Sequence, residues 1–455
     1  MAFSYHGADV CGTRLAEEVK AFAAAHPHVH RISFVCYSAG GLYARYAVGL
    51  LWQEGLLVGK EEEEGTQEKK SSSSSKSSSS SGSSSRSDGL HPLQPLAFIT
   101  LATPHCGCRE VSHTAHGRRR NRVQAFLTDF YCYRTGHQIM LMDSDCKTTS
   151  SSSSSSSSSN NTGSSPAPLP LLLLMTLPSF PFYKGLASFR EIAFYANASN
   201  DHVVHYAAAA VARSNPYHDL ASPPEGEEVA VEGGDEGSSS SSSSSSKKKY
   251  RYVVKETRVD LEEAAWREQQ KEMQEEKRKK DEEQEDEMTE KNKKMKTARK
   301  SEGENEHKEE EEEEEEGDDE DVAMVGALPN SHYGPLHPLA LPVLLPFIAL
   351  HALLLMAPFR LVAGLTASAT PFLPPSLSPS HPPVEIEEVP ELIRRNLSSL
   401  PIKRVDVFLP GMHTHGTIIV RRPLFDKEGI EVLEHVAARI ERVRNEVREG
   451  GKEGL

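Results

Sequence analysis

In residues 31–49, RISFVCYSAGGLYARYAVG, Ser38 stands between a short apolar run and a segment with helical periodicity. Few folds place a serine in such a turn. Residues 31–36 form a short, apolar, β-branched run, which predicts a strand buried on both faces. From residue 42 onward, apolar side chains recur at helical spacing. Ser38 therefore stands at a predicted helix N-terminus, where free N–H groups and the helix dipole favour a developing anion. An ordinary N-cap serine fits the same pattern.

This strand–turn–helix order is that of the nucleophile elbow, G-x-S-x-G, of α/β-hydrolases. Gly40 supplies one of the small residues that let such a turn close, whereas Cys36 stands in place of the other. Because cysteine is small but carries a Cβ, we expect a more strained turn that still closes. Ser38 is therefore a candidate nucleophile.

A serine nucleophile needs a base, usually a histidine that a carboxylate holds in one tautomer. In α/β-hydrolases these residues follow in the order Ser, Asp or Glu, His, each after a strand. Residues 191–196 predict a strand, and Asp201 follows it; the alternative is that Asp201 caps a helix expected from residue 203. Residues 403–409 predict a further strand, and His413 and His415 follow it.

The predicted strands alternate with helical segments, which is typical of a parallel α/β fold. Four strands are expected, at residues 31–36, 96–101, 191–196 and 403–409. An amphipathic helix is expected after the last strand. The leucine- and proline-rich residues 166–178 are expected to form part of a lid or a pocket wall.

Long serine tracts and charge runs interrupt these elements and lack the apolar surface that folding requires. The net charge of −15 is concentrated, because residues 301–321 hold 15 acidic residues against one lysine. The remainder is close to neutral, which predicts no nucleic-acid-binding groove. Since loops lengthen at small entropic cost, we expect the tracts to be inserts in one domain.

The resulting division has four hydrolase segments. They are residues 1–60 with the elbow, 90–146, 166–221 with the acid, and 385–448 with the base and the last helix. Disordered inserts are expected at 61–89, 147–165 and 222–249, a short ordered segment at 250–261, a charged segment at 262–330 that is disordered or a single helix, and an apolar segment at 331–370.

Residues 339–357 carry no formal charge and as a helix would reach ~28 Å, about one hydrocarbon core. Two prolines argue against a simple span, so a hairpin into one leaflet, a lipid-surface anchor and a buried helix remain open. The N-terminus has no apolar signal-peptide region, so we expect a cytoplasmic protein with reduced cysteines. A location at the surface of a membrane or lipid droplet is left open.

The segment HCGCREVSHTAH, residues 105–116, places Cys106 and Cys108 near His113 and His116. A C-x-C pair is not the usual zinc pair, and no second pair follows at ligand spacing. We therefore expect no metal site and no cofactor.

Five segments resemble the putative serine esterase family, a group of lipase-like α/β-hydrolases. ISFVCYSAGGLYARYAVG is similar to the family's ISFVGHSLGGLIARYAIG, FITLATPHCG to its FITLATPHLG, FYANASNDHVVHYAAAAV to its YANVSNDHVVPY, HTHGTIIV to its AHNTIQV, and DVCGTRLAEEV to the helix before its elbow. The resemblance implies a Ser38–Asp201–His415 triad, with His413 as the alternative base and the Ala39 N–H as an oxyanion-hole donor. It implies hydrolysis of acyl esters of lipids or other compounds.

Three departures from the family are visible, and one of them is the unusual length of the serine tracts. Cys36-Tyr37 stand where the family has Gly-His, and only about thirty residues precede the elbow strand, where the family has further strands and an HG loop. We therefore expect an α/β-hydrolase-like parallel sheet that is incomplete at the N-terminus. A serine esterase or lipase is the favoured function; an inactive, lipid-surface-binding or truncated member and an acyltransferase are the alternatives.

Overall fold

The computed structural model describes residues 6–58, 91–109, 133–143, 169–218, 220, 250–301 and 388–450. The chain forms two compact units, one of Met1–Glu263 with Pro358–Leu455 and the other of Ala264–Ala357. The first unit holds the sheet. The inserts expected at 61–89, 147–165 and 222–249 and the apolar segment 331–370 lie outside the described residues.

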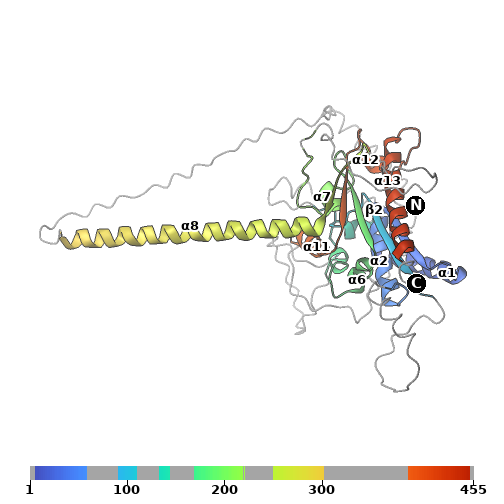
Figure 1. Ribbon diagram of the computed structural model, residues 1–455, viewed down its shortest axis with the longest axis horizontal. Helices are drawn as coiled ribbons and strands as arrows, with labels where there is room; N and C mark the ends of the chain where they lie inside the picture. Colours follow the sequence, from blue (N-terminus) through green and yellow to red (C-terminus); the bar gives the residue numbers. More distant parts are fainter. Residues whose placement is uncertain are drawn as a thin grey trace, which may run out of the picture. The chain divides into compact units, whose positions relative to one another are not determined.

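Five strands form one sheet in the order β1-β2-β3-β5-β4 (Figure 1). Four of them pair in parallel: β1 (Arg31–Tyr37), β2 (Gln94–Leu101), β3 (Glu191–Asn197) and β5 (Lys403–Val407). The predicted α/β class and its four strands are confirmed. Because parallel strands end at a common edge, the segments that follow β1, β3 and β5 meet there.

Strand β4 (Val253–Arg258) runs antiparallel to β5 at one edge of the sheet. The sequence predicted only a short ordered segment here, because four of the six residues of β4 are charged or polar. In the structure only the first two residues of β4 are buried. Helix α8 (Val259–Ser301) follows without a break. Within the described residues, no helix combines the length and apolarity needed to cross a membrane.

Strand β1 differs from its prediction in burial. Phe34 is its one buried residue, and Val35 is 51% exposed. The reason is its position, since among the described residues β1 pairs with β2 alone. The expectation of a strand buried on both faces is therefore wrong.

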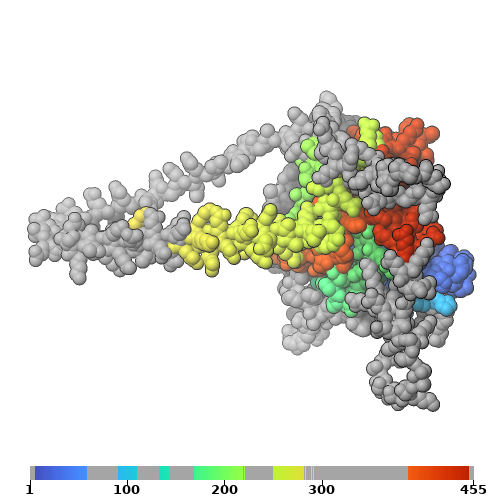
Figure 2. All heavy atoms as spheres, viewed as in Figure 1, coloured from blue at the N-terminus to red at the C-terminus, as the bar shows by residue number. Residues whose placement is uncertain are grey.

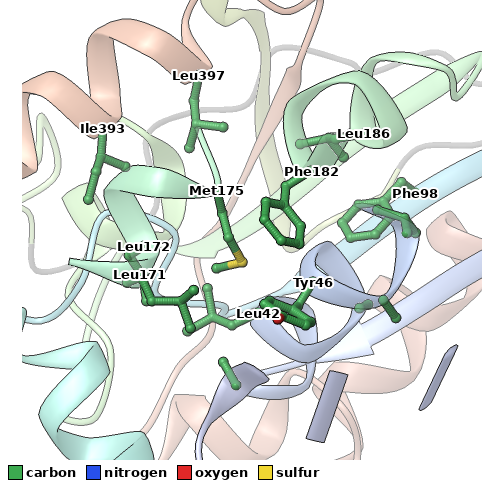
Figure 3. Packing of buried hydrophobic residues seen from close by; sticks show 14 of the residues in the cluster. Leu42, Tyr46, Phe98, Leu171, Leu172, Met175, Phe182, Leu186, Ile393 and Leu397 are labelled. Atoms are coloured by element: carbon green, nitrogen blue, oxygen red, sulfur yellow. The ribbon is translucent and has the colours of Figure 1, made fainter. Parts of the chain in front are cut away.

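One face of the sheet is covered by α2 (Gly40–Gln53), which packs against α1 (Ala8–Ala25) and α6 (Pro181–Ala187). Figure 3 shows side chains of this core, among them Leu42, Tyr46, Phe98, Leu171, Leu172, Met175, Phe182, Leu186, Ile393 and Leu397. Helix α5 (Leu171–Leu174) is fully buried in it beside α11 (Val389–Leu397). Residues 171–176 of the leucine-rich segment are thus core, and the expectation of a lid is wrong, while residues 166–168 lie outside the described residues.

The second apolar cluster joins α13 (Glu428–Gly450) to the sheet. Val432 and Val436 of this helix pack with Ile99 and Val405 from the strands. Two short helices follow the strand ends, α7 (Tyr206–Ala210) after β3 and α12 (Thr414–Thr417) after β5. The acid candidate Asp201 lies in the loop between β3 and α7, and the base candidate His415 lies in α12.

Candidate active site

Ser38 joins β1 to α2 in a left-handed backbone conformation, with a φ of 52°. Such a conformation costs a non-glycine residue about 1–3 kcal/mol, so the surroundings must hold it. The Ser38 N–H donates to the Leu101 carbonyl at 2.9 Å, and Thr103 Oγ1 donates to the Ser38 carbonyl at 2.8 Å. The end of β2 thus secures the sharp turn that a nucleophile elbow requires.

A glycine different from the expected one makes this turn possible. A Cβ added to Gly40 would meet nothing within 4 Å, whereas one added to Gly41 would lie 2.3 Å from Thr103 Oγ1. The expectation that Gly40 lets the turn close is therefore wrong, and Gly41 has that role. Cys36 fits without a glycine, and burial raises the pKa of its thiol to about 12. It stays protonated at neutral pH and does not compete as a nucleophile.

Helix α12 brings His415 against Ser38. His415 Nε2 lies 3.0 Å from Ser38 Oγ, and His415 Nδ1 lies 2.9 Å from Asp201 Oδ2. The three side chains form one hydrogen-bonded line. His413, the alternative base, is the exposed N-cap residue of α12, and His415 makes these contacts in its place.

Asp201 is held by the turn in which it lies. Its Oδ1 accepts the backbone N–H groups of Val203 at 3.0 Å and Val204 at 2.8 Å, and Asn197 Nδ2 donates to Oδ2 at 2.8 Å. Burial acts to raise the pKa of Asp201, but the hydrogen bond and charge of His415, together with the hydrogen bonds from Val204 and Asn197, outweigh it and hold that pKa below its ordinary value. The carboxylate is therefore ionised at neutral pH.

The segment after Asp201 also differs from the expectation. Helix α7 begins at Tyr206 with His205 as its N-cap, later than residue 203. Asp201 therefore closes a turn ahead of the helix and does not cap it. Both of its oxygens are engaged, which fixes the side chain toward His415.

The backbone N–H of Ala39 lies at the N-terminus of α2, where Ala39 is the N-cap. N–H groups of the first helical turn have no acceptor within the helix, so they are free to bind an anion. The position next to Ser38 suits an oxyanion donor.

Three residues at the site were given no role in the sequence analysis. The Tyr37 ring lies 5.0 Å from the His415 ring, centroid to centroid, and burial, followed by the charge of Asp201, raises the pKa of Tyr37 to about 12. Thr103 binds the elbow, and Asn197 binds Asp201. Tyr37, Thr103 and Asn197 all lie inside the quoted motifs. Their contacts join the ends of different strands, so no spacing in the sequence indicates them.

Cys106 and Cys108 are both buried, and burial raises the pKa of Cys106 to about 12. His113 and His116 lie outside the described residues. In the part of the chain that the structure describes, no group of three or more His, Cys, Asp or Glu side chains could hold a metal ion.

Comparison with models of protein families gives a match. Searches of curated proteins and of solved structures found no similar protein. The matching family model is described as putative serine esterase (DUF676), and it covers Ser38 and Asp201 but ends before His415. Residues 1–214 of the chain therefore belong to the putative serine esterase family DUF676.

Proposed function

We propose that this protein is a serine hydrolase that cleaves acyl esters of lipids, with Ser38 as nucleophile, His415 as base and Asp201 as orienting acid. The observation that carries the proposal is the hydrogen-bonded line from Asp201 through His415 to Ser38, with distances of 2.9 and 3.0 Å. The left-handed φ of Ser38 and the family membership of residues 1–214 support it.

The first half of the reaction forms an acyl-enzyme. Because Asp201 is ionised, His415 donates its Nδ1–H to it and keeps Nε2 free as a proton acceptor. Ser38 Oγ gives its proton to Nε2 and bonds to the carbonyl carbon, whose π electron pair moves to oxygen. The Ala39 N–H stabilises that oxyanion. The intermediate then breaks its bond to the alcohol, which takes the proton from His415.

The second half releases the acid. His415 Nε2 takes a proton from water, the hydroxyl oxygen bonds to the acyl carbon, and the bond to Ser38 Oγ breaks. Ser38 regains a proton from His415, and a carboxylic acid leaves. The cycle needs no group beyond these residues and water.

Covalent labelling of the full chain by a fluorophosphonate tests the nucleophile, with Ser38→Ala as the matched variant. We expect labelling that the substitution abolishes, and mass spectrometry that places the adduct on Ser38. A folded protein that stays unlabelled would contradict the proposal and favour the inactive lipid-binding alternative. Release of free acid from labelled acyl esters, with and without an added alcohol, then distinguishes hydrolysis from acyl transfer.

A further inference from the structure

The two most exposed large apolar side chains of the described residues are neighbours. Leu424 is 80% exposed and Phe425 is 75% exposed, and both lie on the loop between α12 and α13. Single exposed apolar residues are common on proteins, but adjacent ones together offer an interaction surface. The C-terminal part of the chain, to which this loop belongs, lies at the surface in Figure 2.

The loop is held in shape by a buried carboxylate. Asp426 is 1% exposed and accepts the Arg422 backbone N–H at 2.7 Å, Arg422 Nη2 at 2.8 Å and Thr417 Oγ1 at 3.0 Å. The last bond joins the loop to α12, the helix that carries His415. The apolar pair is therefore presented to solvent by a fixed turn.

Two more exposed apolar residues lie close in sequence to the base and acid candidates. Met412 is 61% exposed and lies three residues before His415, and Val203 is 56% exposed and lies two residues after Asp201. The loops that carry them are joined, because Thr414 Oγ1 donates to the Ser199 carbonyl at 3.0 Å. The loops that position the base and the acid thus each carry an exposed apolar side chain.

The charges beside the apolar pair are basic. Arg421 and Arg422 precede the pair and Lys427 follows it, and all three are exposed. The one acidic residue among residues 421–427, Asp426, is buried and paired with Arg422. Apolar side chains flanked by arginine and lysine fit a surface of anionic lipid, where the rings and chains enter the interface and the cations meet the headgroups.

We propose that residues 421–427 dock the protein onto an anionic lipid surface and so present Ser38 to acyl esters in that surface. The docking step is argued from the exposure and charge of residues 421–427 alone. Its consequence for catalysis rests on the proposed function.

Cosedimentation of the full chain with phosphatidylcholine vesicles, with and without phosphatidylserine, tests the docking step. We expect binding that phosphatidylserine strengthens and added salt weakens. The double variant Leu424→Ser/Phe425→Ser is expected to lose about tenfold or more in vesicle binding. Arg421→Gln is expected to weaken binding only to vesicles that contain phosphatidylserine.

The matched control is Phe22→Ser, since Phe22 is 54% exposed on α1 and outside the loop. It should bind vesicles as the unmodified protein does. An unchanged unfolding temperature shows that the double variant is folded. Equal vesicle binding by the double variant, or no binding by the unmodified protein, overturns the proposal.

Ser38→Ala separates this proposal from the proposed function, because it should bind vesicles fully while it fails to react with a fluorophosphonate. Vesicle binding without labelling of the unmodified protein would refute the hydrolase and support the docking loop. Labelling without vesicle binding would refute the docking loop alone.

Discussion

Ser38 Oγ and His415 Nε2 lie 3.0 Å apart although 377 positions separate the two residues in the sequence. Ser38 is positioned by β1 and β2, and His415 by β5, so the contact exists only when the C-terminal strand has joined the sheet beside β3. The segment that matches the family model, residues 1–214, holds the nucleophile and acid candidates but not the base. Folding of the C-terminal part is thus a condition for an active site.

The variant Asp201→Asn tests whether Asp201 orients His415, because the substitution should leave the fold intact. The asparagine oxygen can still accept the N–H groups of Val203 and Val204, so the turn is kept. Its NH₂ group would face His415 Nδ1 and reverse the tautomer, and we expect fluorophosphonate labelling to slow by ~10³–10⁴-fold. The measurement is the labelling rate beside the unfolding temperature, which should change little. A rate within about tenfold of the unmodified protein would contradict the assigned role.

His415→Ala and His413→Ala form a matched pair two residues apart. His415 contacts both Ser38 and Asp201, whereas His413 is exposed at the N-cap of α12. We expect the first substitution to abolish measurable labelling of Ser38 and the second to leave its rate unchanged. The reverse result would assign the base to His413.

The sequence predicts the parallel strands because each is a compact apolar run before a turn, and it predicts the order Ser38, Asp201 and then His413 or His415, of which the family resemblance favours His415. It misses β4 because that strand is largely charged and owes its place to pairing with β5. It overestimates the burial of β1 because neighbours in a sheet are set by topology. Tyr37 and Thr103 could not be assigned for a similar reason, since their contacts depend on which strand ends come together.

Gly41→Ala tests the packing of the elbow. The new methyl group would lie 2.3 Å from Thr103 Oγ1 and displace the hydroxyl that binds the Ser38 carbonyl. We expect a loss of roughly 1–3 kcal/mol in the free energy of unfolding, measured by urea denaturation. Gly40→Ala is the control, because its methyl group would meet no atom within 4 Å. Equal losses of unfolding free energy in the two variants would contradict the assignment of Gly41, and not Gly40, as the glycine that lets the turn close.

Tyr37 supports the ring of His415, and two substitutions separate its ring from its hydroxyl. Tyr37→Phe keeps the ring that lies 5.0 Å from the His415 ring and removes a buried hydroxyl without a hydrogen-bond partner among the described residues. We expect it to leave stability equal or slightly raised. Tyr37→Ala opens space beside His415 and should slow labelling of Ser38. If the alanine variant labelled as fast as the phenylalanine variant, the ring contact would have no part in positioning the base.

His435 makes stability depend on pH. Burial, together with the charges of Arg439 and Arg442, lowers its pKa to about 3, and its Nδ1 lies 2.7 Å from Tyr195 Oη. Between an unfolded pKa of about 6.5 and the folded value, the unfolded chain binds one more proton than the folded chain. This contribution to stability is therefore complete above the unfolded pKa and is lost as the pH falls, by about 1.4 kcal/mol for each pH unit.

His435→Gln removes this titration and keeps a polar side chain beside Tyr195. Urea denaturation between about pH 5 and pH 7 should give a smaller decrease in the free energy of unfolding on acidification for the variant than for the unmodified protein. Below the unfolded pKa of histidine the difference should approach about 1.4 kcal/mol for each pH unit. Parallel curves would mean that His435 takes up its proton in the folded state as readily as in the unfolded one, so that its burial between α13, which carries it, and β3 does not oppose the charge.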